Sequence, residues 1–313
     1  MPKYHVCTIR PPGNQFPLCF REMSALIQYG LQELGHDCTQ SDNSLHHDRT
    51  NIIFGYHEWW KPVHPLTAIR DYDCILYQAE QLQPGGRQMP DWYFTALRSR
   101  PVWDYSLDNI KLCRLNGMNP AHVPPCWSEL YQPIDIHEEK STDVLFMGAL
   151  NGRREYMLKL IGTMASVHGM CGVWGIERDD HMAGCRMLLN IHYYQSQTLE
   201  LLRLTHAMNS GIPVVSEVSE NNPYGEAIAM CPYHELPATV IRLLHNPGEL
   251  IALGVYGREE FRKTSMAETI NQALSNNTEP AGDSGTGSVE PSLATTAPTV
   301  ATANNPPLDP PVA

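Results

Sequence analysis

The chain has 313 residues, of which 42% are hydrophobic and 18% charged, and its formal net charge is -12. The length is enough for two domains of ordinary size, and no apolar run approaches the ~20 residues that span a bilayer. The negative charge disfavours non-specific binding to nucleic acid or anionic membranes. The N-terminus lacks the apolar core of a signal peptide, and nine scattered cysteines without a CxxC pair favour reduced thiols. We therefore expect a cytoplasmic protein.

Apolar segments of strand length alternate with helical segments in the first half of the chain. Tyr4–Ile9 is expected to form a strand, and Leu18–Leu34 an amphipathic helix that ends at Gly35. Further strands are predicted at Asn51–Gly55, Asp73–Tyr77 and Pro101–Ser106, and a helix cap at Asp108-Asn109. This alternation is typical of an α/β domain, and polar residues at the strand ends are expected to meet at one edge of its sheet.

The polar segment Gln132–Thr142 separates this half from a second one, so we predict domains at residues 1–138 and 139–275. The second half is expected to hold strands at Asp143–Gly148, Gly172–Gly175 and near Ala227–Met230, and helices at about Leu236–Leu244 and Pro247–Ala273. From Ser275 onward the chain lacks Lys, Arg and aromatic residues. It cannot bury enough apolar surface to offset its ordering entropy, and we expect residues 276–313 to be a disordered tail.

Asn190–Glu217 is predicted to be one βαβ unit. A strand end is followed by a helical segment, by the stop Asn209-Ser210-Gly211, and by the short buried strand Ile212–Val215. In such units ligands lie at the carboxyl ends of the strands, beside helix N-termini. The polar residues expected at that edge are His192, Tyr193, Gln197, Glu200 and Glu217.

Arg153 and Arg154 follow a predicted strand and open a predicted helix. Backbone N–H groups and cations together suit a diphosphate. The alternative is a solvated first helical turn, although cations there oppose the helix dipole. Glu200 and Arg203 lie one helical turn apart, and here we favour a carboxylate that accepts from ribose hydroxyls over an intrahelical ion pair.

Other candidates have simpler explanations. A lone histidine such as His192 is more often a structural group than a catalyst. Glu177-Arg178-Asp179-Asp180 is either a charged loop or a frame for a base and its phosphates. The sequence contains no G-x-G-x-x-G, G-x-x-x-x-G-K-[ST], G-x-S-x-G or H-E-x-x-H motif. His46-His47-Asp48 lacks a spaced third ligand, so no metal site is predicted.

Taken together, these segments resemble GT-B glycosyltransferases, in particular the bacterial and phage proteins loosely called family-1-like. The resemblance rests on ILYQAEQL (75–82), VWDYSLDNI (102–110), DVLFMGALNGRRE (143–155), GIERDDHMA (175–183), LLNIHYY (188–194), LELLRLTHAMNSGIPVVSE (199–217) and YHELPATVIRLL (233–244). It implies two Rossmann-like domains that face a cleft. It also implies a nucleotide-sugar bound by the second domain, with Arg153 and Arg154 near the diphosphate and Glu200 near the ribose, and an acceptor bound by the first. Glu177, Arg178 and Arg203 are further candidates for donor binding.

The chain departs from this family at one pair of positions. Many retaining relatives carry a Glu-x7-Glu pair, and here the matching positions hold Thr198 and His206. Retention or inversion therefore stays open. An inverting mechanism needs a base from the first half, and Asp104 and Glu80 are the candidates, although both suit structural roles at strand ends. His192 is the third candidate catalytic residue. GT-B enzymes generally need no metal for the donor, so no cofactor is expected.

The predicted function is metal-independent transfer of a sugar from a nucleotide-sugar to an unknown acceptor, which is a glycan, a protein or a modified nucleic acid. The alternative is a non-catalytic protein that binds a nucleotide-sugar or glycan with the same fold. A dinucleotide-dependent oxidoreductase is disfavoured because the glycine fingerprint is absent.

Overall fold

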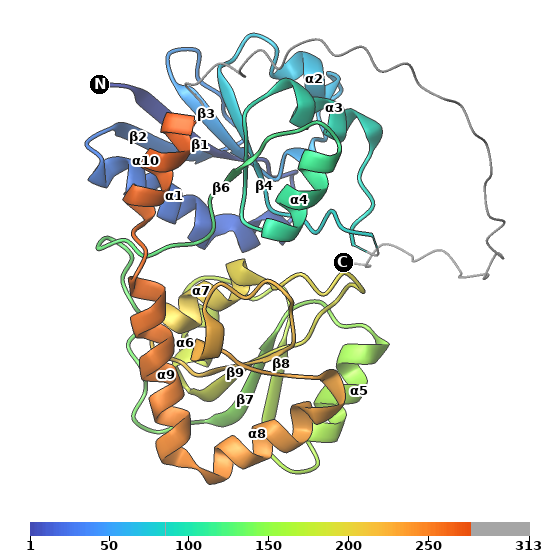
Figure 1. Cartoon of the computed structure of the whole chain (residues 1–313), viewed down its shortest axis with the longest axis vertical. Helices are drawn as coiled ribbons and strands as arrows, with labels where there is room; N and C mark the ends of the chain where they lie inside the picture. The colour runs from blue at the N-terminus through green and yellow to red at the C-terminus, as the bar shows by residue number, and fades with distance from the viewer. Residues whose placement is uncertain (85, 277–313) are drawn as a thin grey trace, which may run out of the picture. The chain divides into compact units, whose positions relative to one another are not determined.

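The computed structural model describes residues 1–84 and 86–276. Its strands form two sheets, shown in Figure 1, and within each sheet every strand runs parallel to its neighbours. Parallel neighbours cannot be joined by tight turns and need crossover segments, which are usually helices. The predicted α/β architecture with two sheets is confirmed.

The first sheet has the strand order β2-β1-β3-β4-β5-β6. Its strands are β1 (Lys3–Thr8), β2 (Asp37–Asp42), β3 (Thr50–Phe54), β4 (Cys74–Gln78), β5 (Val102–Asp104) and β6 (Ala121–His122). The helical segments between them are η1 (Phe16–Phe20), α1 (Arg21–Glu33), η2 (Tyr56–Glu58), α2 (Pro65–Ala68), α3 (Asp91–Ser99) and α4 (Leu107–Leu115). Every residue of β4 is buried, as expected for a parallel strand that is covered on both faces.

The second sheet has the strand order β11-β10-β9-β7-β8. Its strands are β7 (Thr142–Met147), β8 (Val167–Met170), β9 (Cys185–Asn190), β10 (Val214–Glu217) and β11 (Ala229–Cys231). Its helices are α5 (Gly152–Ile161), α6 (Ile176–Ala183), α7 (Leu201–Asn209), η3 (Gly225–Ala227), η4 (Tyr233–Glu235), α8 (Leu236–His245) and α9 (Pro247–Arg262). The strand order reverses between β7 and β9, because β8 follows β7 on one side and β10 follows β9 on the other. Ligands of open α/β sheets bind at such a switch point.

The prediction of a strand at Gly172–Gly175 is wrong. The strand is β8, which ends at Met170, and residues 171–175 form the turn that leads into α6. Gly172 and Gly175 have φ values of +75° and +64°, which lie outside the range of an extended strand. The segment Ile176–Asp180, expected to be a loop, is the first part of α6.

The single helix expected at Pro247–Ala273 is two helices, α9 and α10 (Met266–Asn276). The chain leaves the helix between them because backbone hydrogen bonds to Trp127 replace helical ones. Trp127 N donates to Thr264 O at 3.0 Å, and Met266 N donates to Trp127 O at 2.7 Å. The turn sends α10 along α1, as Figure 1 shows. Gly30 of α1 allows this approach, since a Cβ there would lie 2.8 Å from Ile270 Cδ1.

Other boundaries follow the sequence more closely. The helix predicted at Leu18–Leu34 is divided into η1 and α1, and it stops before Gly35, which has φ +81°. The helix α4 is capped by Ser106, whose Oγ accepts from Asn109 N, and not by the expected Asp108-Asn109. The proposed domain boundary at 138–139 falls between β6 and β7, and the division into domains stays a prediction. The expected disordered tail lies outside the described residues, apart from Asn276 at the end of α10.

Candidate functional site

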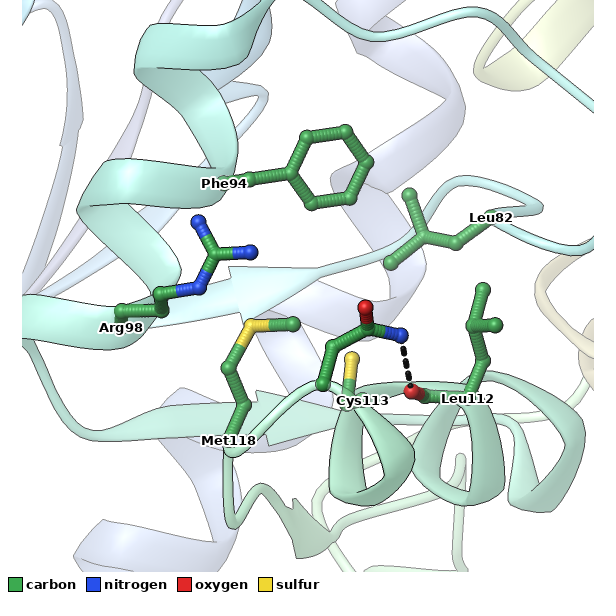
Figure 2. A pocket seen from close by; sticks show the side chains of 7 residues that line it. Leu82, Phe94, Arg98, Leu112, Cys113 and Met118 are labelled. Carbon is green, nitrogen blue, oxygen red and sulfur yellow. Dashed lines mark hydrogen bonds between the residues drawn. The ribbon is translucent and has the colours of Figure 1, made fainter. Parts of the chain in front are cut away.

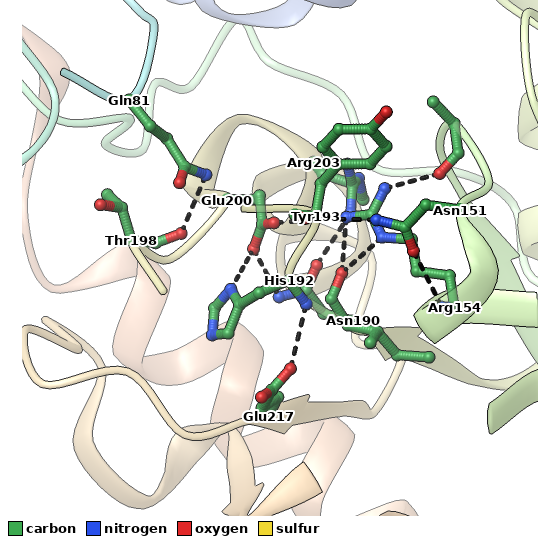
Figure 3. A network of polar contacts seen from close by, with 12 residues as sticks. Gln81, Asn151, Arg154, Asn190, His192, Tyr193, Thr198, Glu200, Arg203 and Glu217 are labelled. Carbon is green, nitrogen blue, oxygen red and sulfur yellow. Dashed lines mark hydrogen bonds and ion pairs between the residues drawn. The ribbon is translucent and has the colours of Figure 1, made fainter. Parts of the chain in front are cut away.

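Predicted site residues of the second half gather at the carboxyl edge of its sheet. They lie on the segments that follow β7, β9 and β10, around the reversal of strand order between β7 and β9. Figure 3 shows their polar contacts, which join Arg154, Arg203, Glu200, His192 and Asn190 in one network. Sequence alone predicted the edge but not these contacts.

Arg154 is a buried cation that ties two of these segments together. It stands in the first turn of α5, which is capped by Asn151, and its side chain is 1% exposed. Its Nε donates to Ile191 O at 2.9 Å and its Nη1 to Ala149 O at 2.8 Å, while Nη2 lies 3.4 Å from Glu200 Oε1. The side chain is therefore held in place chiefly by backbone carbonyls.

Arg203 brings a second guanidinium to the same place. A Cβ on Gly148 would lie 3.0 Å from Nη2 of Arg203 and 3.2 Å from Nη1 of Arg154. Within residues 1–84 and 86–276, the only hydrogen-bond partner of the Arg203 side chain is Asn190 Oδ1, at 3.0 Å. Burial and the charge of Arg203 lower the pKa of Arg154 to about 10. Two cations that lie this close, with too few carboxylates to neutralise them, favour the binding of an anion beside them.

We expect Gly148→Ala to destabilise the protein and to disturb the two guanidiniums. Gly148 has φ +145°, a conformation that costs a residue with a Cβ roughly 1–3 kcal/mol, and the added carbon would press on Arg203. Urea unfolding measures the loss. Gly152→Ala is the matched control, because its Cβ meets nothing within 4 Å and alanine favours the helix by up to about 1 kcal/mol. Equal stability of both variants would contradict the expected strain at Gly148.

Arg153 has a different environment from its neighbour. Its guanidinium donates to both carboxylate oxygens of Glu217, and the distance from Nη1 to Oε2 is 2.7 Å. The same guanidinium stacks on Tyr233, with its central carbon 3.9 Å from the ring centre. The hydroxyl of Tyr233 donates to the carbonyl of Arg153 at 2.7 Å. An anion at this position would therefore compete with Glu217 for the guanidinium.

Glu200 is placed at the start of α7, as predicted, where it is the N-cap residue. Its Oε2 lies 2.9 Å from both Asn190 Nδ2 and His192 Nδ1. The other imidazole nitrogen of His192 lies 3.1 Å from Val218 O and 3.0 Å from Ser219 Oγ. His192 is 1% exposed, so it connects the segments after β9 and β10 as a structural group would.

The pairing of Glu200 with His192 predicts a pH dependence. Burial opposes both charges, but their hydrogen bond and attraction outweigh it, raising the pKa of His192 above 6.5 and lowering that of Glu200 to about 2. The contribution of His192 to the stability of the folded protein is complete below pH 6.5 and is lost as pH rises through its raised pKa. The contribution of Glu200 to that stability is complete above pH 4.5 and is lost as pH falls toward 2.

The stability difference between wild type and Glu200→Gln should therefore be largest between about pH 4.5 and 6.5, on the order of 2 kcal/mol, and should shrink at pH 9. Urea unfolding across this range measures it. Glu235→Gln removes an exposed carboxylate beside His234 and is the control, with little change expected. A pH-independent difference for Glu200→Gln would contradict the ion pair.

The candidate bases of the first half lie in two different environments. Glu80, after β4, has its Oε1 3.2 Å from His57 Nε2 and 3.3 Å from Arg87 Nη1. Burial disfavours its charge, yet the His57 hydrogen bond and the neighbouring charges lower its pKa. Asp104 is fully buried, and burial raises its pKa well above 3.8 although Ser106 N donates to it at 2.8 Å. These surroundings favour the ionised form of Glu80 and the neutral form of Asp104.

The remaining predicted residues lie apart from the arginine pair. Arg178 bonds to Glu22 of α1 at 2.5 Å and to Asp179 at 2.6 Å, and Glu177 is exposed at the start of α6. His206, at a position where the family resemblance implies a carboxylate, has Nδ1 2.7 Å from the Tyr131 hydroxyl. Among the described residues, no cluster of three or more His, Cys, Asp or Glu could hold a metal ion.

Sequence reasoning missed several residues of this edge and of the surroundings of Glu80. Gly148, Asn190 and Tyr233 were not singled out, and neither were His57 and Arg87 beside Glu80. The only available signal was position, since Gly148 and Asn190 stand at the ends of predicted strands and His57 follows another. No helix in the described part of the chain is long and apolar enough to cross a bilayer.

Comparison with known proteins gives relatives without an assigned activity. No model of a known protein family matches the chain. Protein L140 of Acanthamoeba polyphaga mimivirus, described as uncharacterized, is 31% identical over 196 residues, which cover 56% of this chain and 61% of L140. Uncharacterized protein L137 of the same virus is 31% identical over 159 residues, which cover 46% of this chain and 21% of L137. The chain thus spans less than two thirds of either relative.

Solved structures show the fold. T4 phage BGT in complex with UDP and Mn2+ superposes with a TM-score of 0.57 at 11% identity, and its complex with UDP-glucose with 0.55 at 11%; each match covers 88% of this chain and 98% of the other. AviGT4, a glycosyltransferase involved in avilamycin A biosynthesis, gives 0.52 at 15%, with the same coverage. The chain has the GT-B fold of glycosyltransferases.

Proposed function

We propose that the protein transfers a sugar from a nucleoside diphosphate sugar to an acceptor hydroxyl without a metal cofactor. The bond between the anomeric carbon and the diphosphate oxygen breaks, a bond from that carbon to the acceptor oxygen forms, and the acceptor proton leaves to a base. The acceptor is a glycan, a protein or a modified nucleic acid. The observation that carries the proposal is the guanidinium pair of Arg154 and Arg203 beside Gly148, in a GT-B fold.

The chemistry requires positive charge where the diphosphate leaves. Negative charge grows on the leaving group in the transition state, and preorganised donors stabilise it best. Arg203 offers Nη2, and the amide groups of Gly152 and Arg153 at the N-terminus of α5 have no acceptor among the described residues. A helix N-terminus with free N–H groups favours phosphate. We assign Arg203 and this helix end to the diphosphate, with Arg154 as the residue that positions both loops.

Glu200 is proposed to bind the ribose. Its Oε2 is used by Asn190 and His192, while Oε1 is left with a 3.4 Å contact to Arg154. An ionised carboxylate oxygen can accept from a ribose hydroxyl. Wild type should therefore bind UDP more tightly than 2′-deoxy-UDP in calorimetry, and Glu200→Gln should reduce that preference. If the variant distinguishes UDP from 2′-deoxy-UDP as well as wild type does, Glu200 does not bind the ribose.

Incubation with a panel of nucleotide-sugars, followed by assay of free nucleotide, tests the function. UDP-glucose is the first donor, because it is bound in one structure of the same fold. Parallel reactions with EDTA and with Mn2+ test metal independence. Release of nucleotide by at least one donor, unchanged by EDTA, is expected. Activity that appears only with Mn2+ would contradict the metal-independent mechanism.

The alternative is a protein that binds the nucleotide-sugar without turnover. It is favoured by Thr198 and His206 at the positions where many relatives carry carboxylates, and by the engagement of His206 with Tyr131 and Asp179. Calorimetry distinguishes the two functions. Saturable binding of a nucleotide-sugar with no release of nucleotide for any donor would support the binding protein.

A further inference from the structure

A cavity of about 200 Å³ lies between α3 and α4 (Figure 2), and neither Arg154 nor Arg203 lines it. Five apolar side chains line it: Leu82, Phe94, Leu112, Cys113 and Met118. One water needs roughly 10–15 Å³ of such volume, so the cavity has room for a small organic molecule.

The walls are held in place by the fold. Leu82 N donates to Asn109 Oδ1 of α4 at 3.0 Å, and Met118 N donates to Cys113 O at 3.0 Å, which fixes Met118 at the end of α4. Leu82, Cys113 and Met118 are buried. Binding sites for small molecules are usually preformed in this way, with mostly apolar walls and few polar groups.

One cation stands at the side of this cavity. Arg98 follows Phe94 by four residues on α3 and therefore projects from the same flank of the helix, and Figure 2 shows its guanidinium beside Phe94 and Met118. Arg98 takes part in no ion pair formed by the described residues. The amide of Asn116, at the same cavity, donates to Leu112 O at 2.9 Å.

We propose that this cavity binds a small amphipathic anion, with an apolar body among the five side chains and a carboxylate on Arg98. The apolar walls favour the body by removing it from water, and the unpaired guanidinium supplies the complementary charge. The site is separate from the arginine pair and does not depend on the proposed glycosyl transfer.

Titration of the full chain with hexanoate, followed by ligand-observed NMR, tests the site. Hexanol is the uncharged probe and acetate lacks the apolar body. Hexanoate should bind saturably and about two- to fivefold more tightly than hexanol at low salt, a ratio limited by the exposure of Arg98. Acetate should not bind, and saturating UDP should not displace hexanoate.

Two variants and one control separate the contributions. Arg98→Gln should bring hexanoate to the affinity of hexanol, and Leu112→Trp should fill the cavity and abolish binding of both. Arg114→Gln removes an exposed cation of α4 that does not line the cavity and should bind as wild type does. Absence of saturable binding, equal binding by Arg98→Gln and wild type, or displacement by UDP would overturn the proposal.

Discussion

Replacing Arg203 with glutamine is expected to weaken UDP binding about 10–150-fold and to cost about 1–3 kcal/mol of stability. The expected loss corresponds to one charge-assisted contact of roughly 1.5–3 kcal/mol. The cost in stability should stay in this range because the Arg203 side chain satisfies one buried acceptor, Asn190 Oδ1. Calorimetry with UDP and urea unfolding measure the two quantities.

Arg154→Gln should behave differently, although it removes a charge from the same place. Arg154 satisfies the carbonyls of Ile191 and Ala149, and a buried acceptor left unsatisfied costs about 1–3 kcal/mol, so the variant should lose about 2–6 kcal/mol of stability. Arg242→Gln, at an exposed pair with Glu249, is the control for both measurements. Wild-type stability of Arg154→Gln, or wild-type UDP affinity of Arg203→Gln, would contradict this division of roles.

These two arginines also show what the sequence could not predict. Arg153 and Arg154 are adjacent and look alike, but successive residues of a helix point about 100° apart. One guanidinium is consequently buried against Ile191, and the other reaches Glu217 and Tyr233. The pattern of residues identified the helix start, and only the packing of neighbouring segments decided which arginine is buried.

Elements with local signals were predictable. Gly35 marks the end of α1, and the segment Asn190–Glu217 contains its strand end, helix, glycine stop and strand in order. Signals that depend on distant residues were not. Arg178 finds its partner Glu22 across 156 positions of the chain, and α10 leaves α9 because Trp127 offers its backbone groups at that point. The glycines of the turn after β8 were misinterpreted because an apolar Val-Trp pair lies between them.

If transfer proceeds as proposed, Glu80→Gln is expected to slow nucleotide release about 10²–10⁴-fold, the range of a general base, with UDP affinity unchanged. Glu80 is the better candidate because His57 and Arg87 favour its ionised carboxylate, whereas burial favours the neutral form of Asp104. Asp104→Asn should therefore retain most activity, since an amide resembles the neutral acid and its oxygen can still accept from Ser106 N and Asn109 Nδ2.

The pH profile distinguishes a base from a structural ion pair. A lowered pKa means that the Glu80 carboxylate is lost only as pH falls below its ordinary value of 4.5, so release by wild type should be level above about pH 5 and should decline below it. Glu58→Gln is the matched control: it removes the other carboxylate beside His57 and Arg87 while leaving the proposed base. A large loss in Asp104→Asn with full activity in Glu80→Gln would move the base to Asp104. Equal losses of activity in Glu58→Gln and Glu80→Gln would instead show that His57, Glu58, Glu80 and Arg87 act together by holding the loop after β4 in place.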